Sequence, residues 1–147
     1  RRLVEWCQEN LTFVSCAVNQ LHPPLPYDDA MFDCVYAISV FTHMSAPLQS
    51  LWMQELKRVI RPGGHLILTT HGESYRDRLT ASEREAFGAG QFVVRYEEAS
   101  GMNLCTAFHP ESYVRRTLSG GFEVRDFMPA LTRPALNQDL YLLKKDA

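Results

Sequence analysis

The order of hydrophobic and polar positions in this chain predicts an α/β domain. Two apolar runs, over 12–18 and 32–41, have the composition of β-strands. The second run is almost continuously apolar, which is typical of a strand covered on both faces by helices, as in a parallel sheet. Between the two runs, 19–29 contains three prolines and two adjacent aspartates and is predicted to be a long surface loop.

The clearest helical pattern follows the second strand and runs from Ser45 to Arg61. Its apolar residues recur at steps of three, four and eight positions, which is the spacing of one helix face. Ser45 is the predicted N-cap, because a hydroxyl suits the free backbone donors of a first turn. Pro62 cannot continue the helix, and Gly63 is predicted to take the left-handed turn into a strand over 65–70. Strand, helix and strand at this spacing predict a right-handed crossover.

Shorter elements are predicted after this third strand. Thr80 and Glu83 have the spacing of a capping box, which opens a short helix that Gly88 ends. The last two strands are separated by a loop of ten residues and are expected to close the domain as an antiparallel pair. The remaining predicted elements are, in order, strands over 91–96 and near 104–108, a helix from 110 to the glycines at 120 and 121, and the closing strands over 122–128 and 139–144.

Composition places the chain among globular domains, since 147 residues with 46% hydrophobic and 22% charged positions suffice for one core and are too few for two. The formal net charge is -2, from 15 basic and 17 acidic residues spread along the chain. This distribution excludes nucleic-acid binding by bulk electrostatics and an anchor to anionic membranes. No apolar stretch approaches the roughly 20 residues of a membrane span. We therefore expect a cytoplasmic protein, and its oligomeric state stays open.

The cysteines and the first residues add two expectations. The four cysteines form no C-x-x-C pair, and three of them lie in or beside apolar runs, so they are interpreted as reduced core thiols. An amphipathic helical pattern begins at Leu3 with no start signal before it. We therefore expect the chain to begin inside a structure.

Three short motifs, in a fixed order and spacing, carry a resemblance to a known family. The first precedes the second strand, the next opens that strand, and the last leads into the third strand; they are Leu25-Pro26-Tyr27, Phe32-Asp33 and Arg61-Pro62-Gly63-Gly64. Together they resemble class I S-adenosylmethionine-dependent methyltransferases. The resemblance covers essentially the whole chain, from the second helix of such a domain to its last strand. It implies that residues 1–147 are the C-terminal two-thirds of the domain, without its glycine-rich cofactor loop.

The resemblance also implies the fold in more detail. We expect a three-layer Rossmann-like α/β sheet that is mostly parallel, ends in an antiparallel strand pair and is incomplete at the N-terminus. In the family's strand order, the two absent strands would lie between the first and second strands of this chain, so a gap in the sheet is expected. A fragment of this kind is expected to be inactive alone.

S-adenosylmethionine is the cofactor that the resemblance implies. Ligands of open α/β sheets lie beyond the carboxyl ends of the strands. The resemblance places Asn19 and Gln20, which follow the first strand, at the adenine edge. Ser39, Val40 and Phe41, at the end of the second strand, are expected beneath the methionine portion. Asn19 departs from the family, in which an aspartate is common at this position.

Methyl transfer from a sulfonium needs an in-line approach, a dry pocket and, for some acceptors, a base. His71 and Glu73 follow the third strand, where an acceptor can lose its proton, and are the candidate catalytic residues. A solvated loop histidine and a surface acid are the alternative interpretation. His43 and Tyr75 are candidate substrate-binding residues, with a structural role in the loop as the alternative for His43. No metal site is expected.

The predicted function is methyl transfer to a small-molecule or glycan-like acceptor. Two other classes stay open. A nicotinamide-dependent oxidoreductase has similar strands and crossovers, although it would normally lack the closing antiparallel pair. The second is a non-enzymatic interaction module on a decayed methyltransferase scaffold, and the polar residues at the three strand ends argue against it.

Overall fold

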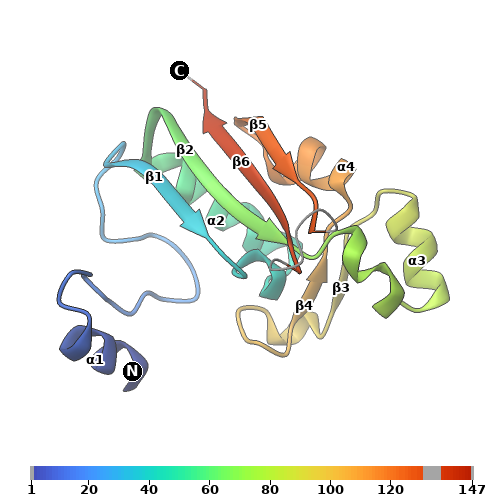
Figure 1. The fold of residues 1–147 in the computed structure, drawn as a ribbon, viewed down its shortest axis with the longest axis horizontal. Coiled ribbons are helices and arrows are strands. Elements are labelled where there is room, and N and C mark those ends of the chain that lie inside the picture. Colours follow the sequence, from blue (N-terminus) through green and yellow to red (C-terminus); the bar gives the residue numbers. More distant parts are fainter. Residues whose placement is uncertain (1, 131–136, 147) are drawn as a thin grey trace.

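Residues 2–130 and 137–146 are described by a computed structural model, in which one four-stranded sheet organises the chain (Figure 1). Its strands are β1 (Phe32–Ala37), β2 (Ile60–Thr70), β5 (Phe122–Met128) and β6 (Asp139–Lys145), in the order β1-β2-β6-β5. β1 runs parallel to β2, whereas β6 is antiparallel to both of its neighbours. The closing antiparallel pair is therefore confirmed, but within the described residues the sheet is mixed rather than mostly parallel.

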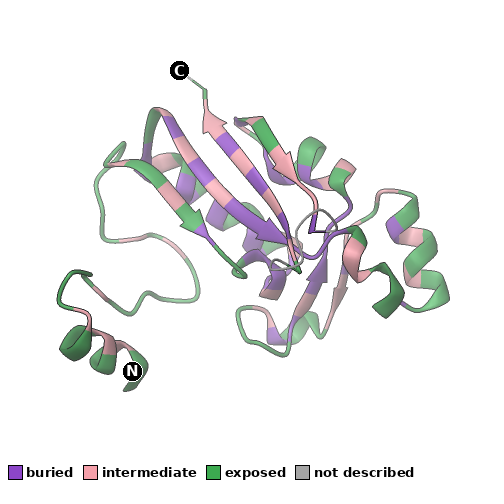
Figure 2. Cartoon of the chain, viewed as in Figure 1, coloured by how far each residue is buried: buried purple, intermediate pink, exposed green. Residues whose placement is uncertain are grey.

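Helices pack against one face of this sheet. α2 (Ala46–Val59) and the turn formed by α4 (Glu111–Tyr113) and the π-helix η4 (Val114–Leu118) lie behind the sheet in Figure 1. Along β6 buried and half-buried residues alternate (Figure 2), because successive side chains point to opposite faces. The helices and the strand residues that face them share the main core, which includes Leu48, Trp52, Leu56, Leu66, Leu68, Val114, Leu118, Tyr141 and Leu143.

The segment before β1 differs most from the prediction. α1 (Arg2–Asn10) is the helix expected at the start, but 12–18 forms no strand, so that prediction is wrong. A strand needs a neighbour for its backbone hydrogen bonds. The segment lies away from the sheet (Figure 1), and Phe13 is 83% exposed. The predicted loop that follows it, over 19–29, is confirmed.

β1 is an edge strand of the described sheet and is shorter than predicted. It ends at Ala37, and the chain then turns through Ser39 into the 3₁₀ turn η1 (Phe41–His43). The described residues cover one face of β1 only, since Tyr36 is 75% exposed, so the predicted cover on both faces stays a prediction. The parallel pairing with the next strand is confirmed, with Ala37 opposite Leu68.

The turn from α2 into β2 confirms one glycine prediction and corrects a boundary. α2 ends at Val59 rather than at the predicted Arg61, because Ile60 already belongs to β2. The ladder between β1 and β2 is irregular at this point, and residues 61–64 bulge out of it. Gly63 has a φ of 72° and so takes the predicted left-handed conformation.

An insertion between β2 and α4 carries a second, smaller sheet. It contains η2 (Glu73–Arg78), α3 (Ala81–Gly88), η3 (Glu97–Ala99) and the antiparallel pair β3 (Val93–Arg95) and β4 (Thr106–Phe108). Both predicted strands of this region are confirmed in shorter form. The capping box is confirmed as well: the Thr80 hydroxyl accepts the Glu83 backbone N–H (3.4 Å), and the Glu83 carboxylate accepts the Thr80 backbone N–H (2.7 Å).

Two further predictions concern the C-terminal part. The helix expected from 110 begins at Glu111 and passes into η4 before the glycines at 120 and 121. The loop expected between the closing strands falls partly on 131–136, which lies outside the described residues. Across the residues that the structure does describe, no helix has the length and apolar character needed to cross a membrane.

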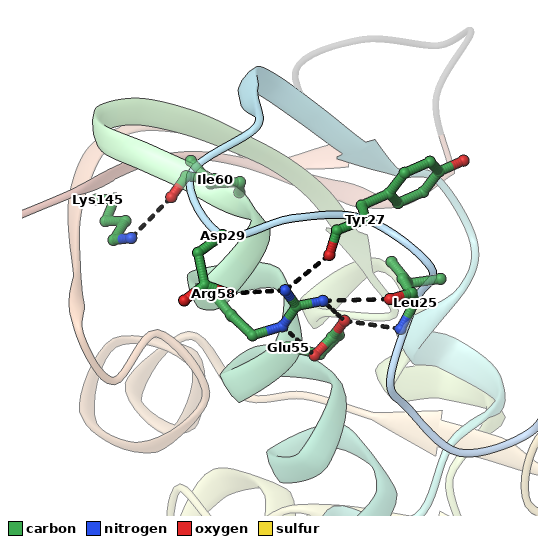
Figure 3. Close-up of polar contacts among 7 residues, drawn as sticks. All are labelled: Leu25, Tyr27, Asp29, Glu55, Arg58, Ile60 and Lys145. Carbon is green, nitrogen blue, oxygen red and sulfur yellow. Dashed lines mark hydrogen bonds and ion pairs between the residues drawn. The ribbon is translucent and has the colours of Figure 1, made fainter.

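The guanidinium of Arg58 ties the loop before β1 to α2 (Figure 3). It donates hydrogen bonds to the backbone oxygens of Leu25 (3.2 Å) and Tyr27 (2.8 Å). It also donates to the carboxylates of Asp29 (2.8 Å) and Glu55 (2.6 Å). The hydrogen bond from Arg58 lowers the pKa of Glu55 below its usual value, so this carboxylate stays ionised. We call Leu25, Tyr27, Asp29, Glu55 and Arg58 the Arg58 clamp.

Gly64 is predicted not to tolerate a side chain. A Cβ atom at this position would lie 2.7 Å from Ile60 Cγ2 and 2.9 Å from the backbone oxygen of Asp33. We expect Gly64→Ala to lower the free energy of unfolding by about 1–3 kcal/mol through overpacking, measured by urea denaturation. Gly120→Ala is the control, because its Cβ would meet the Thr117 oxygen at 3.5 Å, an ordinary contact. Equal stability of the two variants would contradict the predicted crowding.

Arg58→Lys is predicted to loosen the loop held by the Arg58 clamp, although the charge is kept. A lysine ammonium lacks the planar fork that binds carboxylates and carbonyl oxygens together. We expect faster amide hydrogen exchange over 25–30, with little change in the exchange of β2. Arg84→Lys, at an exposed position of α3, is the control. Unchanged exchange over 25–30 would show that the clamp does not hold this loop.

Candidate functional site

A groove of about 570 Å³ at the carboxyl end of β1 brings together residues that the sequence predicts to contact the cofactor. An adjoining cavity of about 290 Å³ is lined in part by Asn19, Val40 and Phe41. We call the first of these the strand-end groove. Four of the five predicted cofactor residues thus meet at one place, and Ser39 has contacts elsewhere. The strand-end groove is lined by Asn19, Gln20, Leu21, Val40, Met44, Trp52, Glu98, Ser100, Gly101 and Met102.

Two anchors on α2 position the first wall of the groove. Trp52 Nε1 donates a hydrogen bond to the backbone oxygen of Leu21 (3.0 Å). The Arg58 clamp holds the same loop a few residues further along. The helix that packs on the sheet therefore also fixes the segment that carries Asn19 and Gln20. Because both anchors bind backbone atoms, they set the path of the loop rather than the identity of its side chains.

The insertion supplies the opposite wall. The Ser45 backbone N–H donates to Ser100 Oγ (2.8 Å), and the Gly101 N–H donates to the backbone oxygen of His43 (2.7 Å). His43 Nδ1 donates to the backbone oxygen of Cys105 (2.8 Å), since a carbonyl oxygen can only accept. Gly101 has a φ of 87°, which favours glycine. His43, a candidate substrate-binding residue, thus joins η1 to the insertion.

Several of the residues that line the groove could not be predicted from the sequence. Ser100 and Met102 come from the insertion, and their place depends on contacts with the start of α2 that no motif indicates. The position of Trp52 in the helical pattern predicts that its side chain lies in the core, and Trp52 is indeed only 7% exposed. Its side chain also lines the groove. Glu98, which no motif marks, also lines the groove. Arg95, three residues earlier, instead pairs with Glu83 (2.5 Å).

Ser39 lies at the same edge of the sheet with a different set of contacts. It has a φ of 56°, a left-handed conformation that residues other than glycine adopt infrequently. Its backbone N–H donates to Thr69 Oγ1 (2.9 Å), and its hydroxyl accepts a hydrogen bond from Gln138 Nε2 (2.6 Å). Gln138 has no predicted role, because nothing in the local sequence pattern relates it to the end of β1.

His71 follows β2 directly and is 7% exposed. Its Nδ1 donates to the backbone oxygen of Ala107 (3.1 Å), which leaves Nε2 as an acceptor. The ring stacks on Tyr75, with the two centroids 4.0 Å apart. Burial lowers the pKa of His71 from 6.5 to about 4, so the imidazole is neutral at pH 7. A neutral ring with an accepting Nε2 has the charge state of a general base.

Glu73 lies apart from the other residues that are predicted to bind the acceptor or to take its proton. Glu73 is exposed and pairs with Arg76 (2.8 Å) within η2. It lines a different cavity, of about 500 Å³. His43 lies beside His71, with ring centroids 6.5 Å apart, and Tyr75 stacks on the same ring. His43, His71 and Tyr75 therefore form one cluster, and Glu73 lies outside it.

The strand-end groove fits an adenosyl group that bears a cationic sulfonium. Val40, Met44 and Trp52 give it apolar walls, and the amide of Asn19 gives it a polar edge. Among the described residues that line the groove, Glu98 alone is charged, so none of them places a cation against the sulfonium. Within 2–130 and 137–146, no group of three or more His, Cys, Asp or Glu side chains could hold a metal ion.

Sequence comparisons find relatives of part of the chain. Residues 2–68 match a family described as a methyltransferase domain. A protein of Streptomyces fradiae, described as an uncharacterized 37.1 kDa protein in transposon TN4556, is 39% identical over 72 residues. The matched segment is 49% of this chain and 19% of that protein.

Solved structures share the fold. A SAM-dependent methyltransferase from Methanosarcina mazei aligns with a TM-score of 0.56 and 19% identity, over 84% of this chain and 63% of that one. An S-adenosylmethionine-dependent methyltransferase from Mesorhizobium loti aligns with a TM-score of 0.58 and 14% identity, over 86% of this chain and 67% of that one. The chain thus spans less than two thirds of the Methanosarcina protein. Residues 2–68 thus match the methyltransferase-domain family, and the fold of the chain is shared with S-adenosylmethionine-dependent methyltransferases.

Proposed function

We propose that this chain serves S-adenosylmethionine-dependent methyl transfer to a small-molecule or glycan-like acceptor. The observation that carries the proposal is the strand-end groove, where most of the candidate cofactor residues meet. In this proposal, Asn19 and Gln20 contact the adenine. Val40 and Phe41 lie beneath the methionine portion, and Ser39 shapes the turn that presents them.

We further propose that the complete sheet extends beyond β1 as a three-layer Rossmann-like fold. Residues 1–147 would then form the C-terminal two-thirds of the domain. Two observations support this extension. β1 pairs with β2 alone among the described strands. The sheet face opposite α2 is only half-buried at Ile67, Leu140 and Leu142, and a third layer would cover it.

S-adenosylmethionine supplies a methyl group activated by the charge of its sulfonium. The part of the protein in this proposal is to orient the acceptor, exclude water and take a proton from a hydroxyl acceptor. His71 receives that proton at Nε2, because its Nδ1 is already engaged with the Ala107 oxygen. The acceptor hydroxyl then takes the place at Nε2 that the Gln138 amide faces at 3.5 Å. His43 and Tyr75, which lie beside the His71 ring, contact the acceptor. Glu73 is the alternative base.

Cofactor binding tests the groove directly. We expect the full-length protein to bind S-adenosylmethionine and S-adenosylhomocysteine in calorimetry. Val40→Lys is expected to weaken binding of S-adenosylmethionine about tenfold, or ~1.4 kcal/mol, and to affect S-adenosylhomocysteine less, because only the former carries the sulfonium charge. Leu51→Lys, at an exposed α2 position outside the groove, is the control. If the unmodified protein binds neither compound, the proposal fails.

His71→Gln is expected to lower the maximal rate by about 10²- to 10⁴-fold with a hydroxyl acceptor, while cofactor affinity changes little. Glutamine keeps much of the volume of the side chain but cannot act as a base. His22→Gln, in the exposed loop before β1, is the matched control. A rate unaffected by His71→Gln would direct attention to Glu73, or to a carboxylate acceptor, which needs no base.

The pH dependence gives a second test of His71. Its pKa of about 4 lies below the ordinary value of 6.5, so the rate governed by this group is expected to stay level from pH 7 to near pH 5 and to fall toward pH 4. The contribution of the same group to stability is complete above pH 6.5 and is lost as the pH falls toward 4. A rate that already halves near pH 6.5 would contradict the buried, neutral state of His71.

A further inference from the structure

A closed ring of hydrogen bonds joins the ends of three strands at the edge of the site. The Ser39 backbone N–H donates to Thr69 Oγ1 (2.9 Å), and the Thr69 hydroxyl donates to Gln138 Oε1 (2.5 Å). Gln138 Nε2 then donates to Ser39 Oγ (2.6 Å), which closes the ring. Ser39 follows β1, Thr69 lies in the last part of β2, and Gln138 immediately precedes β6.

The directions of these bonds follow from the chemistry of each group. Thr69 Oγ1 accepts from a backbone N–H, so its single proton is free for Gln138 Oε1. The Gln138 amide therefore has its oxygen toward Thr69 and its nitrogen toward Ser39. The same nitrogen lies 3.5 Å from His71 Nε2, which accepts because Nδ1 already donates to the Ala107 oxygen. Each of the three bonds in the ring thus joins one donor to one acceptor, and hydrogen bonds linked in this way reinforce one another.

The ring holds a backbone conformation that is otherwise unfavourable. Ser39 has a φ of 56°, and a non-glycine residue keeps such a conformation only where its surroundings impose it. Both the N–H and the hydroxyl of Ser39 belong to the ring. Gln138 is in turn held beside Asp139, which pairs with Thr70 at the end of the ladder and accepts the Ala130 N–H at 2.9 Å. The left-handed turn at Ser39 therefore depends on β6 as well as on β1.

We propose that Gln138 is a positioning residue of the site: its amide fixes the Ser39 turn that presents Val40 and Phe41 to the cofactor, and it holds His71 with Nε2 as the accepting nitrogen. The cofactor part of this inference rests on the proposed function. The part that concerns His71 rests on the hydrogen-bond geometry alone.

Binding of S-adenosylhomocysteine to the full-length protein tests the first part. Gln138→Leu and Thr69→Val are each expected to weaken binding on the order of tenfold, and the double variant is expected to lose little more, because both changes open the same ring. Thr69→Ser keeps the hydroxyl and is therefore expected to bind S-adenosylhomocysteine as tightly as the unmodified protein. Gln54→Leu, at an exposed position of α2, is the matched control. Unchanged affinity in Gln138→Leu, or losses that simply add in the double variant, would overturn this part.

Nitrogen-15 NMR of the His71 ring tests the second part without cofactor. The unmodified protein is expected to show the tautomer with hydrogen on Nδ1, and Gln138→Leu is expected to shift the Nε2 signal, whereas Gln54→Leu leaves it in place. Hydrogen on Nε2 in the unmodified protein, or an Nε2 signal insensitive to Gln138→Leu, would overturn the assignment. Failure of the unmodified protein to bind S-adenosylhomocysteine would instead remove the proposed function, and the NMR result would still decide the role of Gln138 at His71.

Discussion

The position of β2 between β1 and β6 is the constraint on which the remaining structure depends. β2 is parallel to β1 and antiparallel to β6, with Ala37 opposite Leu68 and Asp139 opposite Thr70. The carboxyl end of β1 and the amino end of β6 are therefore brought to the carboxyl end of β2. The turn at Ser39, the ring through Gln138 and the start of the insertion all lie at this one edge, which is where ligands of open α/β sheets bind.

The insertion can form a wall of the groove because both of its ends are held at this edge. It leaves β2 at His71 and returns at His109, whose backbone N–H donates to the His71 oxygen (2.8 Å). His109 is fully buried, and burial lowers its pKa to about 3, so its ring is neutral. His109 Nε2 lies 2.9 Å from Gln49 Nε2, and the two hydrogens of this amide nitrogen are donated to the backbone oxygens of Phe41 (3.0 Å) and Met44 (2.9 Å). Gln49 thus joins α2, η1 and the returning insertion within the core.

Elements whose signals are local were predictable, and elements that need a distant partner were not. The apolar period of α2, the capping box at Thr80 and the left-handed glycine at 63 each depend on residues a few positions apart, and the structure contains all three. The apolar run over 12–18 has the composition of a strand but no strand beside it, and it remains irregular. β-propensity describes how well a residue suits a position in a sheet, but a strand forms only where a neighbouring strand is present to pair with it.

Local patterns were thus sufficient for the α/β class, for the crossover from β1 through α2 to β2, and for the motifs that resemble methyltransferases. The same patterns marked Asn19, Gln20, Val40 and Phe41 as strand-end residues. Only the fold brings the first three into one groove and Phe41 into the adjoining cavity. Long-range packing settled the rest: it placed the insertion against the groove, set Glu73 apart from His71, and joined Gln138 to Ser39. Gln138 and Ser39 are 99 positions apart in the sequence. They meet because β6 pairs with β2 in one particular register. The packing of the whole sheet determines this register, and the residues near either position do not.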